Sequence, residues 1–169
     1  MKVLIQFIGA EVLFASILKF AVKNRRNFII VSMLINVLLS IQYFLLNSFS
    51  GGFLCLFGIL RCIIYLYKEK SKFLSKLFLP IFFVACNIII SVLTYTNYFD
   101  IFPAIVLSMN AFIPWLRNVN LMKLLTLSYY PCWFIYDFCV GAWISLIKDL
   151  VVFSISLILL ICKKKQKYQ

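Results

Sequence analysis

The sequence predicts an all-α polytopic membrane protein with seven transmembrane helices, its N-terminus outside and its C-terminus in the cytoplasm. Three observations carry this expectation. Of the 169 residues, 64% are apolar, and the mean hydropathy is +1.04. Only 13% are charged, with 17 Lys and Arg against 5 Asp and Glu and no His, whereas soluble domains carry about 25% charged residues. This composition excludes a soluble enzyme, a disulfide scaffold and a DNA-binding domain.

Seven apolar runs have the roughly 17–25 residues that a helix needs to cross the hydrocarbon core of a bilayer. They are Val3–Val22, Phe28–Leu46, Gly51–Tyr67, Leu77–Tyr95, Asp100–Leu116, Leu121–Asp137 and Gly141–Cys162. The first run contains Glu11 and Lys19 and has no small-residue cleavage site after it, which favours a retained helix over a signal peptide. We therefore expect one transmembrane domain over 1–162 and a basic cytoplasmic tail over 163–169.

The ends of these runs alternate between strongly basic and weakly charged. Basic residues follow the first, third, fifth and seventh runs: Lys23, Arg25, Arg26, Lys68, Lys70, Lys72, Lys76, Arg117, Lys123, Lys163, Lys164, Lys165 and Lys167. The other ends carry Lys2, with Asp100 and Asp137 nearby, and polar turn residues such as Asn47 and Thr96. Because Lys and Arg collect on the cytoplasmic side, the odd number of runs places the N-terminus outside. The tail is read as a stop-transfer anchor, with binding to anionic lipid as the alternative.

The chain matches itself weakly at an offset of 90 residues. Aromatic residues, glycines and leucines pair at this offset: Tyr43-Phe44-Leu45 with Trp133-Phe134-Ile135, Gly51-Gly52-Phe53 with Gly141-Ala142-Trp143, and Leu56 and Leu60 with Leu146 and Leu150. The pattern predicts a first three-helix repeat over 3–67, a linker helix over 77–95 and a second repeat over 100–162. An even number of runs separates the copies, so both point the same way, as in transporters with parallel repeats.

Three ionisable residues fall near the middle of separate runs. Counting about 1.5 Å per residue from the outer ends, Glu11, Arg61 and Asp149 lie at a shared depth of roughly 12–15 Å. Intramembrane charges cost about 2.5–3.5 kcal/mol each by insertion scales, so we expect Glu11 and Arg61 to pair. The three charges either line a substrate site or fix the register of the helices. Lys148 is next to Asp149, and helix neighbours do not face each other; Lys19 and Lys148 are expected to snorkel toward the interfaces.

Uncharged polar residues and one proline complete the candidate site. Asn36, Asn87, Asn110 and Gln42 lie within apolar runs, where they either contact a solute or hydrogen-bond between helices. Pro131 cannot donate to the carbonyl four residues earlier, which makes it a candidate hinge or a tolerated kink.

Catalytic and metal-binding patterns are missing from the sequence. No His, no phosphate loop and no paired carboxylates occur, and the six Cys have no C-x-x-C spacing. We expect no enzyme activity, no cofactor, no metal site and no nucleic-acid partner. The cysteines are interpreted as small apolar fillers.

Short motifs in both halves resemble the YgjV family of bacterial inner-membrane proteins. The resemblance runs from about Ile5 to Cys162 and rests on Gln42-Tyr43-Phe44-Leu45-Leu46, Gly51-Gly52 and Arg61, then on Cys132-Trp133-Phe134-Ile135, Phe138, Gly141 and Asp149. It implies kinship to the SWEET and PQ-loop transporters and so a SWEET-like 3+1+3 fold. In that fold the first and third helices of a repeat are neighbours, which would put Glu11 beside Arg61. Departures from these families are the absence of a Pro-Gln dipeptide, the lack of a proline at Ile41 to match Pro131, and Gln42 where the YgjV family often carries His.

Two functions follow from these patterns. The first is a small-solute transporter of the bacterial inner membrane, with a midplane site built from Glu11, Arg61, Asp149, Asn36, Asn110 and Gln42. Its partners would be the lipid bilayer, an unknown small polar solute and a possible second copy of the chain. The alternative is a membrane scaffold or assembly partner whose intramembrane charges are structural.

Overall fold

The structure, a computed structural model, describes residues 2–68 and 77–166 and is all-helical over them. Two short 3-10 helices, η2 and η3, flank α5. The elements are α1 (Lys2–Ala21), α2 (Arg25–Leu45), α3 (Phe49–Leu66), α4 (Phe78–Leu93), η2 (Tyr98–Asp100), α5 (Ile101–Asn110), η3 (Ile113–Trp115), α6 (Val119–Ser128), α7 (Tyr130–Val140) and α8 (Trp143–Gln166).

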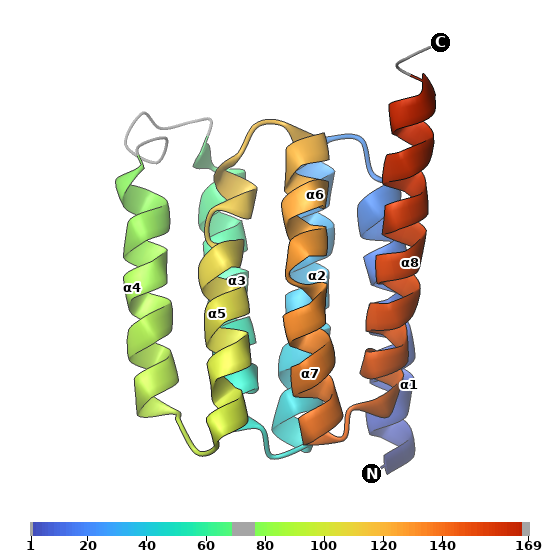
Figure 1. Cartoon of the computed structure of the whole chain (residues 1–169). Coiled ribbons are helices and arrows are strands. Elements are labelled where there is room, and N and C mark those ends of the chain that lie inside the picture. The colour runs from blue at the N-terminus through green and yellow to red at the C-terminus, as the bar shows by residue number, and fades with distance from the viewer. Residues whose placement is uncertain (1, 69–76, 167–169) are drawn as a thin grey trace.

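The helices form two layers (Figure 1). One layer contains α1, α2 and α3, with α2 packed against both of its neighbours; the other contains α5, α7 and α8, with α7 in the middle and α6 continuing α7 along the bundle. The layers contact each other at two edges, where α1 packs on α8 and α3 packs on α5, and α4 packs against α3 and α5 outside the second edge. The N-terminal end of α1 and the C-terminal end of α8 lie at opposite ends of the bundle.

The outer surface of the bundle is apolar. On α4 alone, Ile81, Phe82, Ile88, Ile89 and Val92 are each about half exposed or more. Such continuous apolar surface is rare on soluble monomers. Four stretches are long and apolar enough to cross a membrane: Leu4–Ala21, Arg25–Leu45, Phe49–Leu66 and Tyr98–Trp115. The fold is therefore that of a membrane protein.

The run predicted as one helix over Leu121–Asp137 is instead two helices. α6 ends at Ser128 and α7 begins at Tyr130, because Pro131 lies in the first turn of α7 and has no N–H to continue α6. The break that Pro131 predicts is present, although the proline starts a helix rather than kinking one. Tyr129 lies at the junction, and its carbonyl accepts from the N–H of Cys132.

The prediction that the first and third helices are neighbours is wrong. α2 lies between α1 and α3 (Figure 1), so the order within the layer follows the chain. Glu11 is exposed on α1, whereas Arg61 is buried on the other side of α2. The predicted Glu11–Arg61 pair is therefore not formed.

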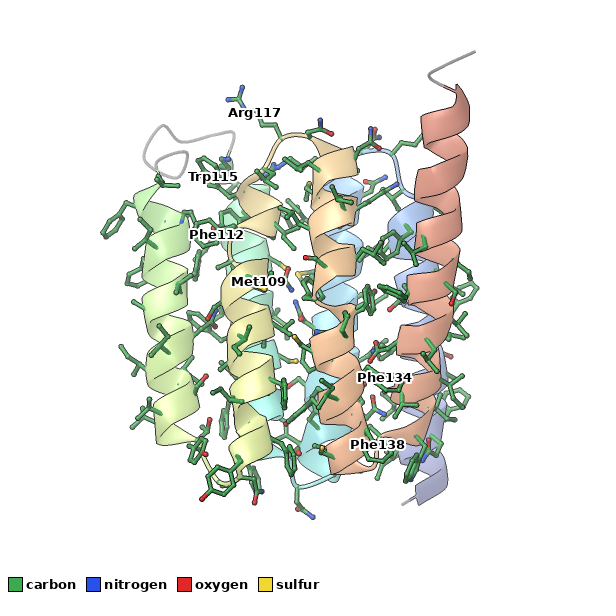
Figure 2. All side chains as sticks on the ribbon, viewed as in Figure 1. Met109, Phe112, Trp115, Arg117, Phe134 and Phe138 are labelled. Atoms are coloured by element: carbon green, nitrogen blue, oxygen red, sulfur yellow. The ribbon has the colours of Figure 1, made fainter. Side chains whose placement is uncertain are left out.

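Basic side chains cap helix ends at one end of the bundle, which we call the basic end. Figure 2 shows Arg117 there, at the same end as the C-terminal end of α8. Arg25 donates to three carbonyls, those of Leu116 (3.1 Å), Tyr65 (3.1 Å) and Pro114 (2.8 Å). In addition, Lys123 donates to the carbonyl of Phe20 (2.5 Å) and Lys68 donates to that of Trp115. Each bond satisfies a carbonyl near the end of a helix, where intrahelical donors run out.

Candidate functional site: a cationic cavity between the layers

A small cavity lies between the two layers. Its volume is about 30 Å³, enough for about one water molecule. Both layers contribute to the wall, which consists of Ser16, Lys19, Ser32, Ile35, Asn36, Leu39, Leu107, Asn110, Tyr129, Tyr130, Trp133 and Lys148. The lining mixes hydroxyl, amide and ammonium groups with apolar side chains, and α1, α2, α5, α7 and α8 all supply residues to it.

Lys19 forms part of the cavity wall from α1. The side chain is buried, and its ammonium lies over the ring of Phe28, 4.8 Å from the centroid. Arg61 and Lys148 are both close enough to interact with it electrostatically. A cation on an aromatic face gains some energy, but Lys19 has no ion pair within 2–68 and 77–166.

Arg61 is 1% exposed and contacts Leu107, a residue of the cavity wall. Its Nη1 donates to the carbonyl of Leu107 at 2.8 Å, while Nε and Nη2 have no partner in the described structure. The Leu107 carbonyl is available because α5 ends there: the Ala111 N–H bonds to Ser108 instead. The Asn87 amide, from α4, donates to the same carbonyl at 2.9 Å.

The third buried cation, Lys148, is paired. Its ammonium lies 2.7 Å from Oδ1 of Asp149 and 3.7 Å from Oδ2 of Asp137, and Tyr43 donates to Oδ1 of Asp137 at 2.6 Å. All of these groups are buried. The expectation that Lys148 and Asp149 do not interact is wrong, because the four-carbon stem of lysine lets the ammonium fold back onto its neighbour.

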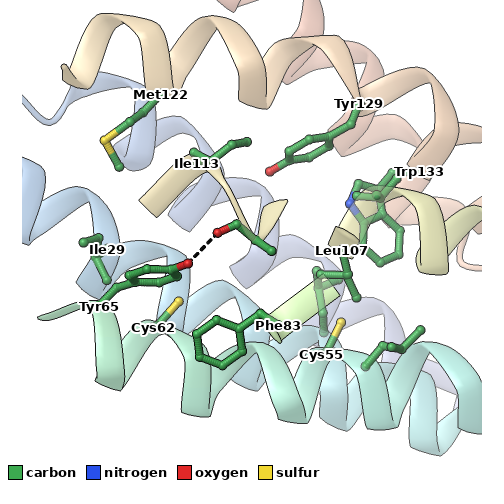
Figure 3. Close-up of a cluster of buried hydrophobic side chains, with 14 of the residues drawn as sticks. Ile29, Cys55, Cys62, Tyr65, Phe83, Leu107, Ile113, Met122, Tyr129 and Trp133 are labelled. Atoms are coloured by element: carbon green, nitrogen blue, oxygen red, sulfur yellow. Dashed lines mark hydrogen bonds between the residues drawn. The ribbon is translucent and has the colours of Figure 1, made fainter. Parts of the chain in front are cut away.

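Aromatic side chains fill the space between the layers next to the cavity. The rings of Tyr43 on α2 and Trp133 on α7 are stacked, 5.7 Å apart, and Tyr136 packs edge-on against both. Gly51 on α3 allows this packing, since a Cβ there would lie 2.6 Å from the Tyr136 hydroxyl. Figure 3 shows the apolar cluster that continues from Trp133 to Tyr65, whose hydroxyl donates to the carbonyl of Ala111 at 2.8 Å.

The sequence-predicted site residues fall into three groups. Asn36 and Asn110 line the cavity. Arg61 is not part of the wall, but it donates to the carbonyl of Leu107, which is. Gln42 is buried elsewhere between the layers, where its amide oxygen accepts from Ser145 at 2.9 Å. Glu11 lies on the outer surface.

Asp149 and Pro131 meet at a different feature. Both line a mostly apolar groove on the α7–α8 side of the bundle, together with Tyr130, Phe134, Leu150 and Phe153. The structure therefore brings Asp149 to the Lys148 ammonium rather than to Arg61 or Glu11.

Sequence reasoning missed Lys19, Lys148 and Asp137. Lys19 and Asp137 lie near the ends of their predicted runs, and Lys148 was expected to snorkel toward the interface, yet each is at least 96% buried. One available signal was the helical phase: Lys19 follows Val12, Ala15 and Ser16 on the buried face of α1.

A family model described as a bacterial inner membrane protein, Imp-YgjV, matches residues 3–167. The chain belongs to this family. The YgjV-family protein is accordingly a protein of the bacterial inner membrane, in agreement with its apolar outer surface and candidate spans. No curated protein and no solved structure matches it.

Proposed function

We propose that this YgjV-family protein is a transporter of a small polar solute, and that the cavity is its binding site. The observation that carries the proposal is the composition of the cavity wall. α1 and α2 contribute one side and α5, α7 and α8 the other, so a solute there contacts both halves of the chain. A site between two halves is the arrangement that alternating access requires.

A parallel 3+1+3 repeat is part of the proposal, with α6 and α7 together forming one span and with the middle helix of each half between the other two, unlike the helix order of the SWEET fold. In Figure 1 the helices of the two layers follow one another in opposite directions: α3, α2, α1 from left to right in one layer and α5, α7, α8 in the other. A two-fold rotation about the bundle axis therefore brings α1 onto α5 and α3 onto α8. Tyr43 and Trp133, which correspond at the 90-residue offset, stack on one another across this axis. Residues close to a two-fold axis meet their own equivalents, as in any isologous contact.

We also propose that the basic end faces the cytoplasm and that the N-terminus is outside. Lys23, Arg25, Lys68, Arg117 and Lys123 all lie in or next to loops at that end. The positive-inside rule then gives this orientation.

Cysteine accessibility tests transport without knowledge of the solute. The native cysteines are replaced by Ala or Ser, and single cysteines are introduced into the cavity wall as Ser16→Cys on α1 and Asn110→Cys on α5. A membrane-impermeant methanethiosulfonate reagent is applied to right-side-out and inside-out vesicles. Since the cavity has room for about one water molecule, labelling reports states in which it has opened.

We expect both positions to be labelled from both sides. Ser48→Cys and Asn118→Cys, in loops at opposite ends of the bundle, serve as sidedness controls. Phe14→Cys is the matched control on the outer face of α1, where the side chain is exposed to lipid rather than to water. Labelling of the cavity positions from one side only, or from neither, would contradict transport.

The alternative function, a scaffold or assembly partner, is favoured by one observation. Glu11 lies on the outer stripe of α1 with Leu4, Phe7, Phe14 and Leu18, all of which are exposed. A carboxylate facing lipid is costly, so a second protein chain on this stripe would explain it. The accessibility experiment separates the two functions, because a scaffold does not need an opening cavity.

A further inference from the structure

We propose that the cavity between the layers binds a small monovalent anion, of the size of chloride, nitrate or formate. The inference rests on the proposed function only in treating this anion as the transported solute. The binding site itself stands on the geometry of Lys19, Arg61 and Lys148.

The first argument is the unpaired hydrogen-bonding capacity of Arg61. The guanidinium is 1% exposed, and two of its three nitrogens have no partner in the described structure. Buried polar groups are almost always hydrogen-bonded, and an arginine with free donors is the residue type that best recognises planar oxyanions. An acceptor is therefore missing beside Arg61, whose Nη1 is bonded to Leu107 of the cavity wall.

The second argument is the balance of buried charge. Two cations, Arg61 and Lys148, lie within electrostatic reach of a third, Lys19. Two buried carboxylates, Asp137 and Asp149, lie close by, and both interact with Lys148. The group as a whole thus carries one positive charge in excess when all members are ionised. Buried charges are stable only when they are compensated, so one negative charge restores neutrality.

The third argument is the chemistry of the cavity wall. The Asn110 side chain lines the cavity and has no hydrogen bond to another described residue, and Asn36 is engaged only by a long contact of 3.8 Å with the sulfur of Cys62. Both amides can donate to an anion. No carboxylate lines this cavity among the residues that the structure describes. The volume of about 30 Å³ limits the ligand to a few heavy atoms.

Thermal unfolding of the detergent-purified protein tests the proposal. Sodium nitrate, chloride, formate and sulfate are titrated at constant ionic strength, with gluconate as the replacing anion because it is too large for the cavity. We expect a saturable rise of the unfolding midpoint, about 5 °C or more at one hundred times the dissociation constant. Sulfate, with two charges and a larger volume, should stabilise less than nitrate.

Three variants identify the site. Lys19→Met should abolish the response to nitrate, whereas Lys19→Arg, which keeps the charge, should retain it. Lys23→Met is the matched control, because Lys23 is exposed four residues further along; its response should equal that of the wild type. Lys19 is preferred over Arg61 for this test because Arg61 also holds α3 to α5.

The results separate this inference from the proposed function. Equal midpoints in nitrate and gluconate, or an undiminished response in Lys19→Met, would overturn the anion site even if the cavity is labelled from both sides. A response that depends on Lys19 supports the anion site. If that response occurs while the cavity is labelled from neither side, the anion is a bound structural ion and the transport proposal fails.

Discussion

Basic side chains have opposite surroundings at the basic end of the bundle and between its layers. At the basic end, Arg25 alone satisfies three carbonyls, and Lys123 satisfies a fourth. Between the layers, the three side-chain nitrogens of Arg61 share one acceptor, and the ammonium of Lys19 contacts the ring of Phe28. The comparison shows that burial of a cation does not by itself reveal its role. The presence or absence of acceptors separates cations that only hold the fold from those to which the proposed anion would bind.

The largest effect should come from Lys148, the interior cation that is paired. Lys148→Met leaves the carboxylates of Asp137 and Asp149 buried without a cation, and such uncompensated charges cost about 3–5 kcal/mol of unfolding free energy. Unfolding by SDS titration in mixed micelles measures the loss. The double variant Lys148→Met with Asp149→Asn should recover part of it; a single variant as stable as the wild type would show that the pair is not structural.

An intermediate effect is expected at the basic end. Arg25→Met removes donors from the carbonyls of Tyr65, Pro114 and Leu116. Water can replace some of these bonds at the end of the bundle, so we expect a loss of about 1–3 kcal/mol in the same titration. Arg26→Met, at an exposed neighbouring position, is the control and should change little. Equal effects of the two substitutions would remove the distinction between capping and solvated cations.

The smallest effect, and the one of opposite sign, should come from Lys19. In gluconate, where no anion fills the cavity, Lys19→Met should leave the unfolding midpoint unchanged or raise it, because replacing a buried unpaired charge by an apolar side chain is neutral or stabilising. In nitrate the wild type should become the more stable of the two. A lower midpoint for Lys19→Met in gluconate would assign Lys19 to the structural cations.

Much of the helix layout could be predicted from the sequence. Hydrophobic runs give most of the helices within a few residues, and Pro131 indicates the break between α6 and α7. The run predicted over Asp100–Leu116 differs more, because α5 ends at Asn110 and the 3-10 helix η3 follows. Asn36 and Asn110, selected for their depth within apolar runs, line the cavity, whereas Asn87 and Gln42 do not. These features depend on local composition, which a sequence displays directly.

The pairing of charges could not be predicted in the same way. Glu11 and Arg61 share a depth, but which helices are neighbours depends on packing, and α2 separates them. Lys148 and Asp149 are adjacent in the chain, and only the bend of a long side chain joins them at 2.7 Å. Depth along a helix can be predicted from a sequence, whereas the order of helices within a layer and the bend of a side chain cannot.

The carbonyl of Leu107 fastens one edge of the bundle. It joins three helices, since it belongs to α5 and accepts from Arg61 on α3 and from Asn87 on α4. Tyr65 ties α3 to the residue after α5 a few positions later. Hydrogen bonds as well as apolar packing therefore resist separation of the layers at this edge of the bundle.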